Sequence, residues 1–317
     1  MLRLVTDAAR NSQIHVSPLL RTPPPEAIEW ALRVIGRGSR LLSAEPLRGG
    51  MSHANHLLHI DTGGGGARVE VVLRRWVRPN WQDDDPELSA EQEAATYGLL
   101  ARSAVPAPRL LAADAAAQEC DVPAVLLTRA PGERMTDPLD MRAFLAQLAQ
   151  VLPAVHGVDP EEVARSVPPY RPYYDRSQLL PPSWTRQPSL WERAIELGSG
   201  SDPGGPPVFI HRDYHQGNTL WSAGRLTAIV DWTSASFGPA AVDLAHMRVN
   251  LAMSFDLEAA DAFLAEYRAA TGGSFTLDPD WDLRATVDLV PELPFPGLPS
   301  GWLDRVEDFI ARALAAC

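Results

Sequence analysis

Two polar stretches that adjoin apolar runs are the part of this sequence best suited to chemistry. HRDYHQGNTLW, at residues 211–221, directly follows the apolar run 208–210 and concentrates ionisable and amide side chains. LTAIVDW, at residues 226–232, is an apolar run with a single carboxylate, Asp231. Turn-forming residues, 222–225, separate the two stretches. The sequence therefore predicts a β-hairpin whose open end carries polar side chains from both strands.

The register of that hairpin decides which side chains meet. If Gly224-Arg225 is the loop, Asn218 pairs with Asp231, because antiparallel partners keep a constant sum of residue numbers. Asp213 lies five residues before Asn218, on the segment that leads into the hairpin. We therefore expect two carboxylates and one carboxamide in one small region.

Oxygen ligands of this kind suit Mg²⁺, which takes few protein ligands and completes its octahedron with water and phosphate oxygens. The spacing from His211 to Asp213 to Asn218, followed by an aspartate that ends an apolar strand, is used in kinase-type phosphoryl transfer. Asp213 is then expected to accept the proton of the attacking hydroxyl, and Asn218 and Asp231 to hold magnesium against the nucleotide phosphates. The plainer alternative is a polar turn that closes a hairpin.

Other polar residues are expected to support this centre. His211 is predicted to brace the loop through hydrogen bonds, and Asp243 to do the same from a helix. His215 is either buried support or a contact of Asp213. Four aromatic residues of the irregular segment 166–190 either line a substrate pocket or anchor a long loop: Tyr170, Tyr173, Tyr174 and Trp184.

The elements that must position these residues fall into two parts. Pro25 and Glu26 open a predicted helix that ends at Gly36. Residues 41–130 show five short strands, with a Gly-rich turn between the second and the third and one long helix, over 87–104, after the third.

After Pro131-Gly132 helical patterns dominate, and Asp137-Pro138 is the predicted start of the first helix. Further helices are predicted over 188–198, 239–253, 256–270, 280–290 and 301–316. The sequence thus predicts an α+β protein of two lobes. Residues 1–130 form an N-lobe with a terminal arm, a helix and a five-stranded antiparallel sheet, and residues 131–317 form a mainly helical C-lobe that holds the catalytic loop.

Charge and composition exclude several classes of protein. The net charge is −12, and residues 231–317 carry 14 acidic residues against 5 arginines, or −9 of that total. This distribution argues against a nucleic-acid partner and is compatible with a cationic ligand, although solvated helical faces explain it equally well. The chain has no lysine, which excludes a Walker A loop. We find no apolar run of membrane-spanning length, no export signal and only two cysteines, and we therefore expect a cytoplasmic protein.

Taken together, these motifs resemble the aminoglycoside phosphotransferase family, whose small-molecule kinases are related in fold to protein kinases. FIHRDYHQGNTLW is similar to the family's catalytic loop, commonly H-G-D-x-H-x-x-N, and IVDWTSASFGPAAVDLAHM to its metal-binding segment. Earlier elements follow in the family's order over roughly residues 40–270. The resemblance implies a protein-kinase-like fold.

The resemblance also implies nucleotide contacts in the N-lobe. LRGGMSHANHLLHI is similar to the phosphate-covering loop, VVLRRW to the strand with the basic phosphate ligand, EQEAATYGLLARSAVPAPRLL to the helix with its ion-pairing glutamate, and VLLTRAPGE to the hinge whose backbone meets adenine. The implied residues are Gly49, Gly50, Ser52, Arg74, Glu93, Thr128 and Ala130. Arg75 and Glu91 are the neighbouring alternatives to Arg74 and Glu93.

Arg212 departs from the family pattern, which commonly has glycine there. Contact with substrate and contact with another carboxylate are both open for its side chain.

The function that follows is transfer of the terminal phosphoryl group of ATP, or of GTP, to a hydroxyl of a small molecule, with Mg²⁺ as cofactor. An amino-bearing acceptor such as an aminoglycoside fits the charge distribution, while macrolide, choline, homoserine and sugar acceptors use the same scaffold. A nucleotide-binding module without catalysis is an alternative. A protein kinase is disfavoured because Asp231-Trp232 replaces Asp-Phe-Gly and no Ala-Pro-Glu follows. We expect no nucleic-acid or membrane partner, and a monomer or weak dimer.

Overall fold

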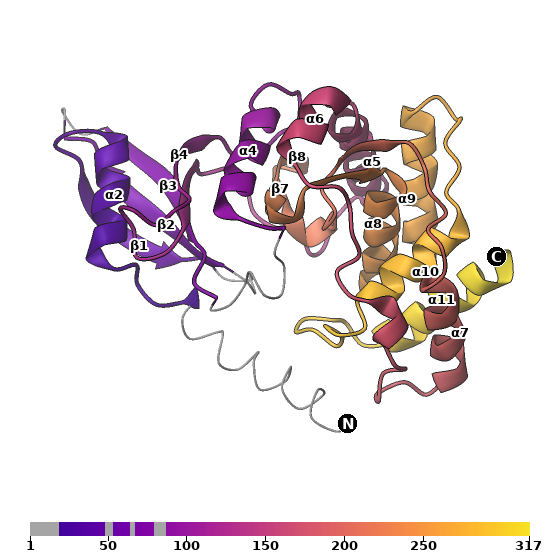
Figure 1. Ribbon diagram of the computed structural model, residues 1–317. Helices are drawn as coiled ribbons and strands as arrows, with labels where there is room; N and C mark the ends of the chain where they lie inside the picture. The colour runs from indigo at the N-terminus through magenta and orange to yellow at the C-terminus, as the bar shows by residue number, and fades with distance from the viewer. Residues whose placement is uncertain (1–18, 48–52, 64–66, 79–86) are drawn as a thin grey trace. The chain divides into compact units, whose positions relative to one another are not determined.

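The computed structural model describes residues 19–47, 53–63, 67–78 and 87–317. The chain divides into two compact units, residues 1–102 with 107–130, and residues 103–106 with 131–317. Figure 1 traces their elements along the sequence. In the described part of the chain we find no helix with the length and apolar character needed to cross a membrane.

The N-terminal unit is built on one five-stranded antiparallel sheet, as the sequence predicts, and its strand order is β1-β2-β3-β5-β4. Its strands are β1 (Arg40–Pro46), β2 (Ala54–Asp61), β3 (Arg68–Arg75), β4 (Leu110–Asp114) and β5 (Ala124–Thr128). Side chains alternate between the two faces of the sheet. Arg74 and Arg75 on β3 therefore point to opposite faces.

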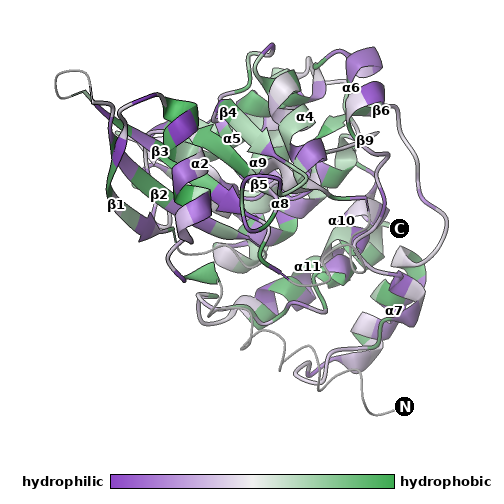
Figure 2. Cartoon of the chain, turned by 60° about the vertical axis from the view of Figure 1, so that its left-hand side comes forward, coloured by the Kyte–Doolittle hydropathy of each residue, from purple (hydrophilic) through white to green (hydrophobic). Residues whose placement is uncertain are grey.

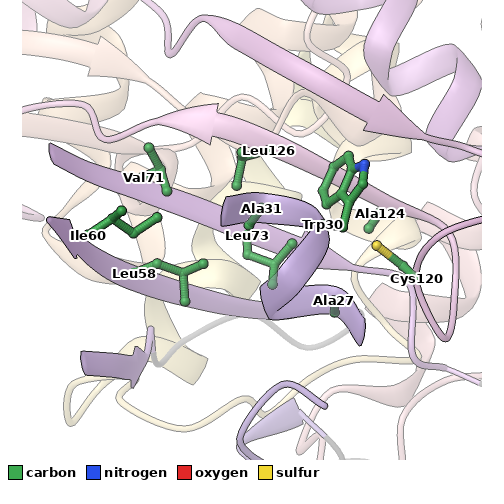
Figure 3. Close-up of a cluster of buried hydrophobic side chains, with 10 residues drawn as sticks. All are labelled: Ala27, Trp30, Ala31, Leu58, Ile60, Val71, Leu73, Cys120, Ala124 and Leu126. Atoms are coloured by element: carbon green, nitrogen blue, oxygen red, sulfur yellow. The ribbon is translucent and has the colours of Figure 1, made fainter. Parts of the chain in front are cut away.

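Helix α2 (Pro25–Ile35) covers one face of this sheet. Pro25 suits the first turn, and Gly36, at φ 142°, ends the helix because other residues rarely adopt that angle. Ala27, Trp30 and Ala31 lie on one side of the helix and point toward apolar side chains of β2, β3 and β5 (Figure 3). Each large side chain buried there contributes about 1.5–3 kcal/mol to folding.

Helix α4 (Ala90–Leu100) follows β3 and is shorter than the predicted 87–104. Its start is fixed by Ser89, whose Oγ accepts a hydrogen bond of 3.1 Å from the backbone nitrogen of Gln92. Glu93, Tyr97 and Leu100 are buried, so the inner side of α4 carries one carboxylate among apolar groups.

The C-terminal unit is mainly helical. Its helices are α5 (Met141–His156), α6 (Pro160–Ser166), α7 (Pro188–Gly198), α8 (Ala241–Ser254), α9 (Leu257–Ala270), α10 (Pro279–Asp288) and α11 (Trp302–Ala316). Helix α8 is buried along almost its whole length and contacts α9, α10 and α11. Helix α11 carries both hydrophobic and hydrophilic residues (Figure 2), and Val306, Phe309, Ile310 and Ala313 form its buried stripe.

Three details of this unit differ from the prediction. Helix α5 starts after Asp140, whose carboxylate accepts from the backbone nitrogen of Ala143 at 2.9 Å, and not at Asp137. Helix α6 was not predicted, although Asp159 caps it and Pro160 opens it. Strand β6 (Pro207–Ile210) pairs with β9 (Ser236–Pro239), a strand that the sequence pattern hides because it contains glycine and proline.

Candidate active site

The segment predicted to be catalytic begins where β6 ends. Phe209 and Ile210 are fully buried and fix the strand, and the next two backbone nitrogens, of His211 and Arg212, donate to the carboxylate of Asp243 at 2.9 Å and 2.7 Å. Asp243 lies in the first turn of α8 and is itself fully buried. These bonds form the brace expected of Asp243, and they set the direction in which the chain enters residue 213.

Asp213 is the point on which the polar groups converge. The amide nitrogen of Asn218 donates 3.0 Å bonds to both the carboxylate and the backbone carbonyl of Asp213. Nε2 of His246 lies 3.1 Å from the same carboxylate, and Nε2 of His215 lies 3.8 Å from it. Because the amide nitrogen of Asn218 is used in this way, its amide oxygen is the atom suited to a cation.

The charge of this cluster is set by burial and by the histidines. Burial alone would raise the pKa of Asp213, but His215 and His246 outweigh that effect and hold the pKa below its usual range. Burial lowers the pKa of His215 to about 4, against the pull of Asp213. The pKa of His246 is raised, because the Asp213 bond outweighs its burial. At neutral pH, then, Asp213 is an anion, and of the two histidines it is His246 whose protonated form the contact with Asp213 favours.

Asp231 follows the hairpin of β7 (Thr219–Ser222) and β8 (Arg225–Ile229). The backbone nitrogen of Val230 donates to the carbonyl of Asn218 at 2.9 Å, and Nε2 of His211 lies 3.0 Å from the carbonyl of Val230. This is the support expected of His211. Asp231 comes next in a left-handed conformation, φ 66° and ψ 58°, and its carboxylate accepts from the Thr233 hydroxyl at 3.2 Å.

The predicted register of this hairpin was wrong by one residue. The turn is Ala223-Gly224, with φ of 49° and 73°, so Ser222 pairs with Arg225. A bulge then shifts the pairing between Leu220 and Trp221. Asn218 is consequently bonded to Val230, and Asp231 is the residue after its partner. Asp213, Asn218 and Asp231 are still brought to one end of the hairpin.

The donor set fits a magnesium ion. Asn218 and Asp231 supply one amide oxygen and one carboxylate, which are hard ligands, and Mg²⁺ keeps several positions for water and phosphate. The described residues contain no group of three His, Cys, Asp or Glu side chains able to hold a metal by themselves. A cation here would thus depend on a phosphorylated ligand for the rest of its coordination.

The N-terminal unit holds a buried ion pair where one was expected. Nε of Arg74 lies 3.0 Å from Oε1 of Glu93, which is fully buried, and a second nitrogen of Arg74 lies 2.9 Å from Nδ1 of His53. Arg75 points to the opposite face and bonds to Asp121. Glu91 is exposed. The geometry favours Arg74 and Glu93 over their neighbours, as the family spacing suggested.

The remaining predicted nucleotide contacts are placed only in part. Thr128 ends β5, and its hydroxyl accepts from the backbone nitrogen of Arg109 at 2.9 Å. Ala130 is the last residue of the N-terminal unit. Gly49, Gly50 and Ser52 lie outside the described residues.

The profile of the phosphotransferase enzyme family matches residues 43–285. The chain belongs to this family. It is a small-molecule phosphotransferase, and the resemblance inferred from its motifs is confirmed. Among curated protein sequences, none matches the chain.

Solved structures agree with the protein-kinase-like fold of this phosphotransferase. A proposed aminoglycoside phosphotransferase from Ralstonia eutropha JMP134 is 16% identical with a TM-score of 0.61, over 93% of this chain and 100% of that one. The macrolide 2′-phosphotransferase MphH from Brachybacterium faecium is 22% identical with a TM-score of 0.52, over 80% and 82%. A thermostable mutant of aminoglycoside phosphotransferase APH(4)-Ia, in complex with AMP-PNP and hygromycin B, is 17% identical with a TM-score of 0.59, over 90% and 96%.

One residue of the candidate site was missed in the sequence. His246 contacts Asp213, yet the motif IVDWTSASFGPAAVDLAHM was interpreted only through its aspartates. The signal was present, because His246 lies three residues after Asp243 and residues at that spacing share one side of a helix. Because Asp243 was predicted to brace the loop, His246, on the same side of the helix, could have been predicted to face that loop too.

Proposed function

We propose that this phosphotransferase moves the terminal phosphoryl group of ATP to a hydroxyl group of a small molecule. The observation that carries the proposal is the convergence of Asp213, Asn218 and Asp231 at the end of one hairpin. A polar turn that merely closes a hairpin has no need of a partly buried carboxylate flanked by two histidines. The presence of AMP-PNP and ADP in crystals of fold neighbours supports an adenine nucleotide.

The chain's own residues divide the work of the reaction. Asp213, ionised at neutral pH, accepts a hydrogen bond from the acceptor hydroxyl and orients its oxygen toward the γ-phosphorus. As the new oxygen–phosphorus bond forms and the bond from the γ-phosphorus to the β–γ bridging oxygen breaks, Asp213 takes the proton. Asn218 also holds the Asp213 carboxylate in place, through its amide nitrogen.

Asn218 and Asp231 would hold Mg²⁺, which supplies neutralisation of the phosphate charge when it is bound. In the N-terminal unit, Arg74 is proposed to contact the phosphates, with Glu93 fixing its guanidinium. Thr128 and Ala130 are proposed to meet the adenine through their backbone, and Gly49, Gly50 and Ser52 to cover the phosphates.

The excess of acidic residues in the C-terminal part does not by itself indicate a cationic acceptor. Many of its carboxylates are engaged inside the unit: Asp243 braces the catalytic segment, Asp282 pairs with Arg248, and Asp288 pairs with Arg176. An amino-bearing acceptor such as an aminoglycoside stays within the proposal, but acceptors of other charge are equally compatible with this pairing.

An ADP-release screen tests the proposal. Purified protein is given Mg-ATP, or Mg-GTP, with amino sugars, macrolides, amino alcohols, sugars, nucleosides and hydroxy acids. We expect at least one acceptor to raise ADP release well above the rate with water, and Asp213→Asn to abolish the increase. Tight Mg-ATP binding without stimulated ADP release by any acceptor would instead support a nucleotide-binding module without catalysis.

A further inference from the structure

Arg212 is a buried cation whose hydrogen-bond donors are only partly used by the protein. Its side chain is 2% exposed, and its Nε and Nη2 atoms have no hydrogen-bond partner among the described residues. The guanidinium carbon lies 4.1 Å from the centre of the Tyr173 ring, which covers one face of the group but accepts none of its in-plane N–H bonds. Buried charged donors without acceptors are costly, and native proteins rarely keep them.

The backbone at Arg212 adds to that cost. Its φ is +69°, in the left-handed region where a side chain is strained and glycine is not. The backbone nitrogen of Arg212 donates to Asp243, an interaction that glycine would make equally well. The chain therefore keeps an arginine where glycine would suit the fold better, which points to a role for the side chain itself.

The nearby carboxylates are already occupied. Asp288 receives two bonds from Arg176, at 2.7 Å and 2.6 Å. Asp213 is bonded to Asn218 and His246. Neither of these carboxylates accepts a hydrogen bond from Nε or Nη2 of Arg212. An acceptor for these N–H groups must therefore come from outside the described residues.

A small cavity meets Arg212 at this point, within the C-terminal unit. The enclosed space is about 20 Å³, enough for one water-sized polar group, and the cavity opens to solvent on one side. Tyr170, Tyr173 and Trp281 provide aromatic walls, and Val242 and Ala245 an apolar side from α8, which contacts α10 (Figure 1). His246 lines the same cavity and contacts Asp213, so a group held here lies beside the centre that receives the hydroxyl.

We propose that this cavity is an acceptor subsite, in which Arg212 binds a carboxylate of the molecule to be phosphorylated. The planar fork of arginine matches a carboxylate, and the enclosed space takes only the oxygen end of such a group. Asp288, which also lines the cavity, is already paired with Arg176. The inference rests on the proposed function and narrows its acceptor to hydroxy acids.

Binding of simple probes tests the subsite without any turnover. Acetate, benzoate and phenylacetate are compared with acetamide, benzamide and phenylacetamide by calorimetric titration of the full chain. We expect the carboxylates to bind about tenfold or more tightly than the amides, the difference typical of charge-assisted hydrogen bonds. Arg212→Gly, which relieves the backbone strain, should remove that preference, and Arg212→Lys should keep part of it, because it retains the charge without the fork. Arg171→Ala, at an exposed arginine, is the matched control and should leave the preference unchanged.

Equal binding of acids and amides, no binding of any carboxylate, or an unchanged preference in Arg212→Gly would each overturn the subsite. A failure of the proposed function would look different, because it would abolish ADP release with every acceptor and leave carboxylate binding intact. In the ADP-release screen, the subsite predicts that hydroxy acids outperform their amides in the wild-type protein alone.

Discussion

Two buried arginines, one in each unit, show how differently this chain treats a cation. Arg74 is 5% exposed and meets Glu93 at 3.0 Å and His53 at 2.9 Å. Arg212 is 2% exposed, and two of its nitrogens have no partner among the described residues. The first cation is neutralised by the protein's own side chains, whereas the second keeps unused donors beside a cavity.

The difference indicates two roles: Arg74 is held in position by its ion pair, whereas Arg212 is available to recognise a ligand. A buried ion pair that is complete holds a side chain in one place, and removing either partner leaves a buried charge. Polar groups with unused donors or acceptors are what a ligand site requires, because the ligand must find partners there. Changes around Asp213 should therefore affect turnover more than folding, and changes around Glu93 should do the reverse.

The largest effect is expected at Asp213. Asp213→Asn keeps the side-chain size but removes the proton acceptor, so turnover should fall by about 10²- to 10⁴-fold. Mg-ATP affinity should change little. The assay uses an acceptor found in the ADP-release screen, with Asp202→Asn, at an exposed acid of the same unit, as control. Near-normal turnover would show that Asp213 is not the proton acceptor. The contrast between a unit whose substitutions affect turnover and one whose substitutions affect stability would then fail.

Breaking the N-terminal pair should cost stability. Glu93→Gln leaves the Arg74 cation buried without its anion, and the free energy of unfolding should fall by about 3 kcal/mol. The matched control is Glu91→Gln, on the exposed side of the same helix, where a change below about 0.5 kcal/mol is expected. Denaturant unfolding monitored by circular dichroism measures both. Equal changes in the free energy of unfolding for the two substitutions would show that the Arg74–Glu93 pair stabilises the protein no more than an exposed glutamate does.

The pH dependence of stability should separate His246 from His215. Folding raises the pKa of His246, through its bond to Asp213 and the nearby Glu292 and Asp243, so its contribution is complete below its unfolded pKa and disappears as the pH rises through the folded value. Folding lowers the pKa of His215 to about 4, so its contribution has the opposite sign and is lost as the pH falls from the unfolded value toward 4.

His246→Asn should therefore destabilise the protein more at about pH 6 than at about pH 9, and His215→Asn should show no such excess at about pH 6. Unfolding midpoints at the two pH values provide the measurement. A pH-independent effect of His246→Asn would show that His246 is not the cation facing Asp213.

The smallest effect concerns the hairpin turn. Ala223 has a positive φ, which asparagine tolerates better than alanine, and Asn-Gly is a preferred pair for this turn. Ala223→Asn should raise the free energy of unfolding by up to about 1 kcal/mol. A loss of stability would instead favour the loop Gly224-Arg225.

The sequence predicted the five-stranded sheet, the helical part and the meeting of Asp213 with Asn218, because their signals are local. Alternating strands, a helix after the third strand and the spacing from Asp213 to Asn218 are all visible in short windows. The pair of Arg74 with Glu93 also followed from spacing along one strand and one helix, once the family order was recognised.

What the sequence did not predict depends on contacts between distant segments or on a single-residue irregularity. The turn at Ala223-Gly224 moves the pairing by two residues from the predicted register, and the bulge at Leu220 and Trp221 restores one of them, although no composition signal marks a bulge. His246 contacts Asp213 across 33 positions of sequence. Strand β9 becomes a strand through its pairing with β6 and not through its own propensity.

The most direct test of the central claim is the binding of ATP with and without magnesium to wild-type protein and to Asp231→Asn. If Asn218 and Asp231 hold the metal beside Asp213, the substitution should weaken Mg-ATP by about tenfold or more and leave ATP in the presence of chelator unaffected. Calorimetric titration measures both affinities, and neither needs a known acceptor. An equal loss of both affinities, or no loss of either, would contradict a magnesium-dependent centre at the end of this hairpin.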